Sequence, residues 1–141
     1  MLFRSVTLVP VAGTAPGVFS VSGGRGPGAI LNSDLSSNSA SRPAERGTDV
    51  VLFATGEGST NPAITEGQLA SAPLPAPVLP VAVRIGGVPA AIRFVGLAPG
   101  FAGLLQINVT IPANASTGAE VPVELQVGTT NAPIGITMSV N

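Results

Sequence analysis

The chain has 141 residues, of which 45% are hydrophobic and only 9% are charged, and its net charge at pH 7 is −1. A chain of this length fits one domain, and its charged fraction is far below the usual quarter. The basic residues are scattered arginines without a single lysine, so we expect neither nucleic-acid nor anionic-lipid binding. The absence of cysteine excludes disulfides and thiolate sites.

Glycine and proline are abundant, with 18 and 14 residues, which approaches the level typical of disordered chains. Valine, isoleucine and leucine are nevertheless frequent and regularly spaced, so their burial can offset the loss of chain entropy. We therefore predict a folded all-β domain with many turns. No apolar run reaches the ~18 residues of a membrane-spanning helix, so no membrane span is predicted.

The first five residues, "MLFRS", contain neither the apolar stretch nor the small-residue cleavage site of a signal peptide. Within them, "LFRS" is what the end of a common sequencing adapter encodes. Two interpretations stay open: residues 1–5 are an assembly artefact, or Met1 is a genuine start. The first makes the chain a fragment whose export signal lies upstream. In both, we predict a single domain over residues 6–141.

The first third of the chain gives weaker signals. The segments "SVTLVPVA" (residues 5–12) and "GVFSVS" (17–22) predict strands, and "PGAILN" (27–32) predicts a returning strand after a glycine-rich turn. Residues 33–47 are polar without periodicity and predict a loop. The next segment, "TDVVLFATG" (48–56), is apolar on both faces, which predicts a central strand.

A long connection and a hairpin follow. Residues 57–80 contain many prolines, which cannot donate to a ladder, so we predict an extended crossover between two sheets. The runs "VAVRI" and "AAIRFV" flank Gly86 and Gly87, whose freedom to adopt positive φ favours a tight hairpin. Arg84 and Arg93 fall on the polar faces of these two strands. We interpret them as solvated arginines, with an anion-binding pair as the alternative.

Strict alternation marks three later segments, "LLQINVTIP", "VPVELQVG" and "PIGITMSV". A period of two predicts strands with one buried and one solvated face. The predicted buried residues are Leu105, Ile107, Val109 and Ile111; Val121, Val123, Leu125 and Val127; and Ile134, Ile136, Met138 and Val140.

Several motifs in this order resemble a known family, the Solibacter-type uncharacterised C-terminal domain of large secreted bacterial proteins. They are "APG-F" (Ala15, Pro16, Gly17, Phe19), "ATG-G" (54–58), "IGGVPA" (85–90) and "LLQINV-IP" (104–112), and the resemblance covers roughly residues 6–141. From residue 48 onward the chain is also similar to the IPT/TIG immunoglobulin-like fold. The matching features are residues 55–58, residues 83–90, and Ile111, Pro112, Gly118, Val121, Val123 and Val127.

The resemblance implies an all-β, antiparallel Ig-like (IPT/TIG-like) β-sandwich with a long proline-rich crossover loop. Residues 6–47 would supply N-terminal strands and a polar loop, and residues 48–141 the IPT/TIG-like part. It also implies an extracellular or cell-surface location at the end of a longer chain. The resemblance implies no catalytic residues, and the upstream domains of the family are not in this sequence.

The sequence contains few candidate catalytic residues. Without His, Cys, Lys or Tyr, the usual bases and activated nucleophiles are missing, so we expect no enzyme activity and no cofactor. A glycosidase-like carboxylate pair would have to come from Asp34, Glu45, Asp49, Glu57 and Glu66. A calcium site would use Asp34, Asp49 and Glu57, but the D-x-D-x-D-G spacing is missing. We interpret these carboxylates as solvated loop groups, and we predict no catalytic, cofactor or metal residues.

Other motifs have simpler interpretations. The glycine loops "GGRGPGA" and "TGEGSTN" lack the G-K-[ST] ending of a phosphate loop and predict turns. Asn108 and Asn114 begin N-glycosylation sequons, which a bacterial source would leave bare. The five phenylalanines, including Phe53 and Phe94, are predicted to pack in the core or in turns.

Our leading hypothesis is a non-catalytic spacer, attachment or adhesion module that contacts neighbouring domains of its parent chain or surface proteins. The loops at residues 55–79 and 97–103 would be free to make such contacts. One alternative is a subunit that self-associates by strand addition through residues 6–12. Another is a carbohydrate-binding module, which the absence of Trp and Tyr disfavours.

Overall fold

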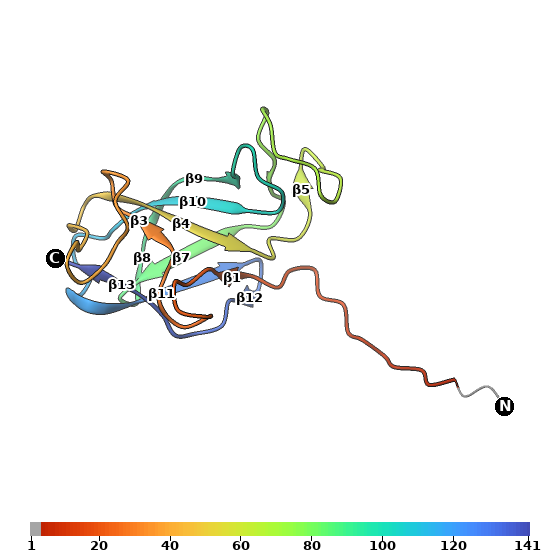
Figure 1. The fold of residues 1–141 in the computed structure, drawn as a ribbon, viewed down its shortest axis with the longest axis horizontal. Coiled ribbons are helices and arrows are strands. Elements are labelled where there is room, and N and C mark those ends of the chain that lie inside the picture. Colours follow the sequence, from red (N-terminus) through yellow and green to blue (C-terminus); the bar gives the residue numbers. More distant parts are fainter. Residues whose placement is uncertain (1–3) are drawn as a thin grey trace.

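The computed structural model describes residues 4–141, and it is a sandwich of two β-sheets (Figure 1). The first sheet has the strand order β1-β4-β10-β9, with β3 also paired to β4. Its strands are β1 (Gly17–Val18), β3 (Ile30–Leu31), β4 (Asp49–Thr55), β9 (Ala91–Leu97) and β10 (Leu105–Thr110). The antiparallel ladders of this sheet confirm the predicted Ig-like β-sandwich class.

The second sheet has the order β2-β13-β11-β7-β8, with β12 also paired to β11. Its strands are β2 (Gly26–Pro27), β7 (Val81–Ile85), β8 (Val88–Pro89), β11 (Gly118–Val127), β12 (Thr130–Asn131) and β13 (Ile136–Val140). The ten-residue β11 organises this sheet, because β13 pairs with its first half and β7 with its second half.

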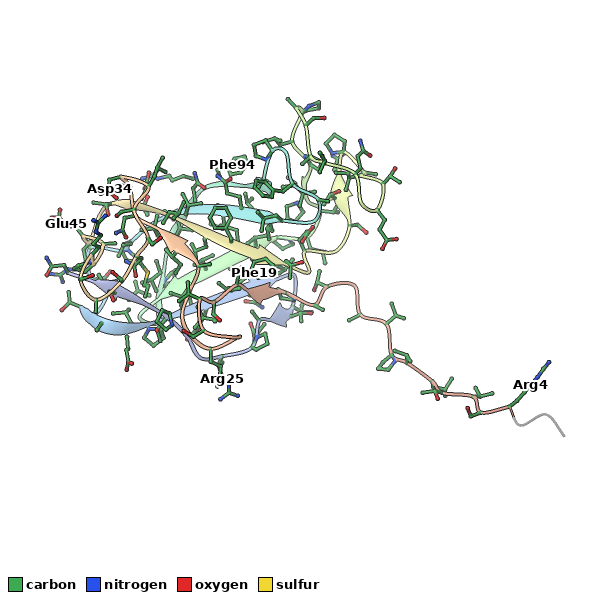
Figure 2. The ribbon with its side chains drawn as sticks, in the orientation of Figure 1. Arg4, Phe19, Arg25, Asp34, Glu45 and Phe94 are labelled. Atoms are coloured by element: carbon green, nitrogen blue, oxygen red, sulfur yellow. The ribbon has the colours of Figure 1, made fainter. Side chains whose placement is uncertain are left out.

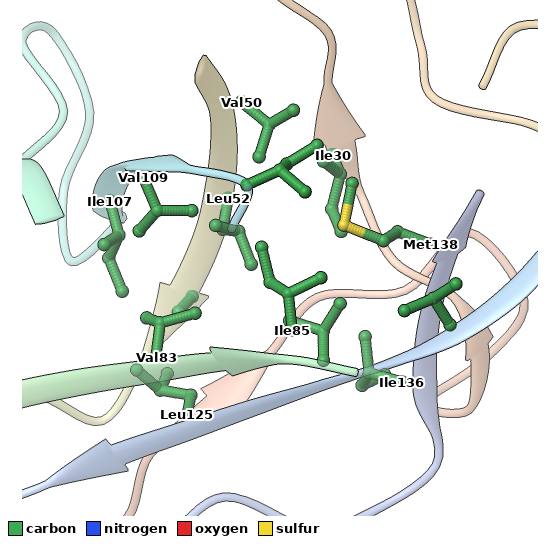
Figure 3. Close-up of a cluster of buried hydrophobic side chains, with 14 of the residues drawn as sticks. Ile30, Val50, Leu52, Val83, Ile85, Ile107, Val109, Leu125, Ile136 and Met138 are labelled. Carbon is green, nitrogen blue, oxygen red and sulfur yellow. The ribbon is translucent and has the colours of Figure 1, made fainter. Parts of the chain in front are cut away.

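The hydrophobic core lies between the sheets and follows the predicted alternation (Figure 3). In the first sheet Leu105, Ile107 and Val109 of β10 are fully buried, and they pair in register with buried residues of β4. β4 is flanked on both sides, by β10 and by β1 with β3, so its predicted central place is confirmed. The second sheet contributes Val83, Ile85, Val121, Val123, Leu125, Val127, Ile136, Met138 and Val140.

The prediction for Ile134 is wrong, because its side chain is 82% exposed. Gly135, at φ +108°, turns the chain immediately before β13 begins at Ile136. The alternating buried positions of this strand therefore start at Ile136, two residues later than the sequence pattern indicated.

The hairpin at Gly86 and Gly87 forms, but it is much shorter than predicted. β7 pairs with β8 only through Arg84 with Pro89 and Ile85 with Val88. The Ala90 N–H still donates to the Val83 carbonyl at 2.9 Å, and the chain then crosses to the first sheet, where β9 pairs with β10. Arg84 and Arg93 consequently lie in different sheets, and the alternative of an anion-binding pair is wrong.

The predicted strand at residues 5–12 is also absent from the structure. From residue 4 to residue 13 the chain is extended, unpaired and exposed, and Figure 1 shows it leaving one end of the sandwich. The chain joins the first sheet where the Ala15 N–H donates to the Gly56 carbonyl, just before β1. Residues 1–3, and with them most of the predicted assembly artefact, lie outside the described residues.

The connection between β4 and β7 carries a small ribbon that the sequence did not predict. β5 (Thr60–Asn61) pairs with β6 (Ala76–Pro77) as a separate two-stranded sheet. This segment is tied to the first sheet because the Leu97 N–H donates to the Pro75 carbonyl at 2.7 Å. It is also tied to the loop after β9 by the pair of bonds between Ala70 and residues 100–101.

Candidate functional site

The five candidate carboxylates are spread over the molecule. Asp34 and Glu45 line one hollow of about 380 Å³ near the C-terminal end of the sandwich (Figure 2). Asp49 begins β4, and Glu57 is buried just beyond the other end of that strand. Within residues 4–141, no group of three acidic side chains could hold a metal ion, so the three carboxylates weighed as calcium ligands are not brought together.

The hollow is polar, and its groups largely satisfy one another. Asp34 accepts hydrogen bonds from the Ser36 hydroxyl at 2.6 Å and from the Ser36 N–H at 3.0 Å. These bonds, with a smaller contribution from the charge of Arg42, hold the pKa of the Asp34 carboxyl below its usual value. Asn32 donates to the Arg42 carbonyl at 3.0 Å and to the Ser36 hydroxyl. These hydrogen bonds order the loop around the hollow.

A buried asparagine behind the hollow attaches the loop at residues 33–47 to the second sheet. The Asn38 amide donates to the Ser139 carbonyl at 2.8 Å and accepts from the Ser139 N–H at 2.7 Å. It also donates to the Asn32 side chain at 2.9 Å. The sequence predicted a loop here correctly, but nothing in its polar composition singled out Asn38 as the residue that fixes it.

The prediction for the phenylalanines is wrong as far as the core is concerned. Within residues 4–141, none of the four belongs to the buried cluster. Phe53 and Phe94 are half-buried, while Phe19 and Phe101 are 43% and 56% exposed. Leu52 and Ala54 on either side of Phe53, and Val95 after Phe94, pack in or against the core, so alternation directs these two rings to the outer face of the first sheet.

Polar side chains accompany these rings on the same outer face. The Gln106 amide donates to the Asn108 side-chain oxygen at 3.0 Å. Further along, Arg93 donates to the Thr110 hydroxyl at 2.7 Å, and Thr110 donates to Asp49. Arg93 and Asp49 also form an exposed ion pair at 3.8 Å. The outer face therefore combines aromatic rings with amides and one neutralised charge pair.

Arg93 occupies a β-bulge, which explains its position at the edge. Val109 pairs with Ile92 and Asn108 with Phe94, so Arg93 is the extra residue of β9 between them. A bulge with a charged side chain makes an edge strand a poor template for another strand. The sequence pattern did not predict this irregularity, because "AAIRFV" alternates as well as a regular strand would.

The remaining motifs are the two glycine-rich loops, predicted to be turns, and the two N-glycosylation sequons. Five of the six glycines in the two glycine-rich loops adopt positive φ, namely Gly23, Gly24, Gly26, Gly56 and Gly58, and Gly28 is the exception. Of the two sequons, Asn108 lies within β10 and Asn114 is exposed in the following loop.

Among residues 4–141 there is no helix with the length and apolar character to cross a membrane. Comparison of the chain with protein-family models, with curated proteins and with solved structures finds no match.

Proposed function

We propose that this domain is a non-catalytic Ig-like module of a larger secreted or cell-surface bacterial protein, where it acts as a spacer, attachment or adhesion element. The family resemblance of its motifs supports the location and the place within a longer chain. Its contacts would be with neighbouring domains of the parent chain or with other surface proteins.

The observation that carries this proposal is that the chain enters and leaves the sandwich at opposite ends (Figure 1). The N-terminal segment joins at Gly56, just after the last residue of β4. The C-terminal Asn141 bonds to Ala44 and Arg46, just before the first residue of that strand. The seven residues of β4 separate the two points by about 20 Å. Domains joined through such ends form an extended row.

The test is a fusion of two copies of residues 4–141, measured by small-angle X-ray scattering beside the single copy. We expect the maximum dimension to increase by about one domain length. A tandem protein no longer than the single domain would show that the copies fold side by side, and the spacer role would be abandoned.

A second candidate, self-association by strand addition, is favoured by one specific observation. The apolar side chains Val6, Leu8, Val9 and Val11 are 86%, 90%, 74% and 95% exposed. Such a segment can add to the sheet edge of another molecule. Light scattering of the chain with and without residues 1–12 tests it. Oligomers that disappear with the deletion would support it, and a monomer at high concentration with the segment intact would rule it out.

A further inference from the structure

Three phenylalanines and one amide form a continuous line across the outer face of the first sheet. In strand order they are Phe19 beside β1, Phe53 on β4, Gln106 on β10 and Phe94 on β9. We call these four residues the aromatic row. The Phe19 N–H donates to the Phe53 carbonyl at 3.0 Å, so the two residues are neighbours across the sheet. Val18 packs against the core, and alternation then directs Phe19 to the outer face.

The ladder register places the other members of the row. Gln106 pairs with Phe53 on one side and with Gly96 on the other. A methyl group added at Gly96 would lie 3.0 Å from the tip of the Phe94 ring, which shows that this ring lies over Gly96. The four positions therefore cover three strand spacings, or about 14 Å. Gly96 is the position that lets the Phe94 ring reach the row.

The amides along the row have unused hydrogen-bonding capacity. Gln106 and Asn108 share one bond, in which the Gln106 amide donates to the Asn108 oxygen. Among the described residues, no group bonds to the Asn108 NH₂ or to the Gln106 oxygen, and neither atom is enclosed by protein. Donors and acceptors thus stand between two aromatic faces, open to solvent.

Charge and shape restrict the class of ligand further. The charged side chains of β4, β9 and β10 are Asp49 and Arg93, which pair with each other, so the face is neutral. A hollow of about 160 Å³, lined mainly by apolar side chains including Val21, Leu31 and Phe53, adjoins the row. A purely hydrocarbon ligand would fit the rings but would leave the amides buried without partners, at a cost in binding free energy. A ligand that has hydroxyl groups and apolar C–H faces can contact the rings and also hydrogen-bond the amides.

We propose that the aromatic row is a binding site for a neutral oligosaccharide. The rings of Phe19, Phe53 and Phe94 contact the C–H faces of successive sugar rings, and Gln106 and Asn108 hydrogen-bond their hydroxyls. The site lies on the outer face of the first sheet, near the end where the N-terminal segment joins, but it uses none of the residues at the two joining points, so it does not rest on the proposed spacer role. An adhesion module would gain its attachment point from it.

The test begins with an array of neutral oligosaccharides, with sulfated glycans included for comparison. A ligand found there is titrated into ¹⁵N-labelled protein and followed by NMR. We expect a neutral glycan to shift the amide signals of residues 53, 94, 96, 106 and 108. Phe19→Ala and Phe94→Ala should each weaken binding about tenfold, because each removes one aromatic contact face. Gly96→Ala should weaken it as well, because the added methyl group would meet the tip of the Phe94 ring at 3.0 Å and the Pro75 carbonyl oxygen at 3.2 Å.

The matched control is Phe101→Ala, since Phe101 is 56% exposed but lies in the loop after β9, off the row. It should bind the glycan as the original protein does, and melting temperatures show whether each variant is folded. Several results would overturn the proposal: no neutral glycan binding at millimolar concentration, binding to sulfated glycans alone, shifts away from the row, or full affinity in folded Phe19→Ala and Phe94→Ala variants. Concentration-dependent shifts of the row without sugar would instead identify it as a contact between copies.

Discussion

Residues 48–141 and residues 4–47 are held in the same sandwich by different means. In the later region, strands of five to ten residues share long ladders, and their alternating apolar faces fill the core. In the earlier region the strands are two residues long, and individual backbone and side-chain bonds attach the chain. A repeated pattern specifies the later region, and single contacts specify the earlier region. Mutations should therefore affect the two regions in different ways.

The core of the later region should give the largest effect. Ile107 is fully buried in β10, and Ile107→Ala would leave a cavity as well as lose burial. We expect it to lower the free energy of unfolding by about 2–5 kcal/mol. Urea denaturation measures this, with Glu120→Ala on the exposed face of β11 as control, expected within about 0.5 kcal/mol of the original protein. A small loss at Ile107 would mean that the regular region does not dominate stability.

A backbone contact between Ala15 and Gly56 should contribute strongly to stability at the point where the earlier region joins the later one. A methyl group at Gly56 would lie 1.9 Å from the Ala15 carbonyl oxygen, whereas the space around Gly100 is open. Both glycines adopt nearly the same positive φ, +78° and +79°, so Gly100→Ala carries the conformational strain without the clash. We expect Gly56→Ala to be less stable than Gly100→Ala by about 1–3 kcal/mol. Equal losses in thermal denaturation would show that residues 13–16 are not held against Gly56.

A single polar side chain should matter almost as much in the earlier region. Asn38→Ala removes three hydrogen bonds and leaves the buried Ser139 N–H without its partner. Each buried group left unpaired costs about 1–3 kcal/mol, so a loss of that order in unfolding free energy is expected. The exposed Ser33→Ala in the same loop should be nearly neutral. If both variants unfold alike, the loop is not anchored through Asn38.

The smallest effect should come from pH. Because the folded-state pKa of Asp34 is lowered from 3.8, its ionised form contributes stability above that pH. The contribution is lost as pH falls through the lower folded-state pKa, and the full exposure of the group keeps it small. We expect the stability difference between the original protein and Asp34→Asn to narrow as the solution is acidified below pH 3.8. In Ser36→Ala, an NMR titration should find the Asp34 pKa closer to 3.8. A difference that widens on acidification would reverse the assigned sign.

The sequence predicted the features that repeat. The buried faces of β10 and β11 follow from alternation, and the central place of β4 follows from its apolar residues on both faces. The change of sheet after Pro89 was missed, since a tight hairpin signal is local and says nothing of which sheet receives the next strand.

The candidate site was hidden for a related reason. Phe53 lies in a segment that is apolar on both faces, so hydrophobicity could not show which face turns outward. In "AAIRFV" regular alternation would place Phe94 opposite Arg93, and the bulge at Arg93 changes that. The row depends on register, which brings Phe53, Gln106 and Gly96 into line from three separate strands. Composition had counted against a carbohydrate site because Trp and Tyr are missing. The proposed site rests instead on the pairing of strands, which aligns phenylalanines from separate strands on one face.

The opposite placement of the two ends has a mechanical consequence. When the ends are pulled apart, the ladders of β1 on β4 and of β13 on β11 are loaded in shear, with their hydrogen bonds strained together. The β1 ladder is only two residues long, so it should give way first while the long ladders hold. Each freed residue would then add roughly 3.3–3.6 Å of length. A row of such modules would lengthen under tension before any core opened, and it would recover when the load was removed.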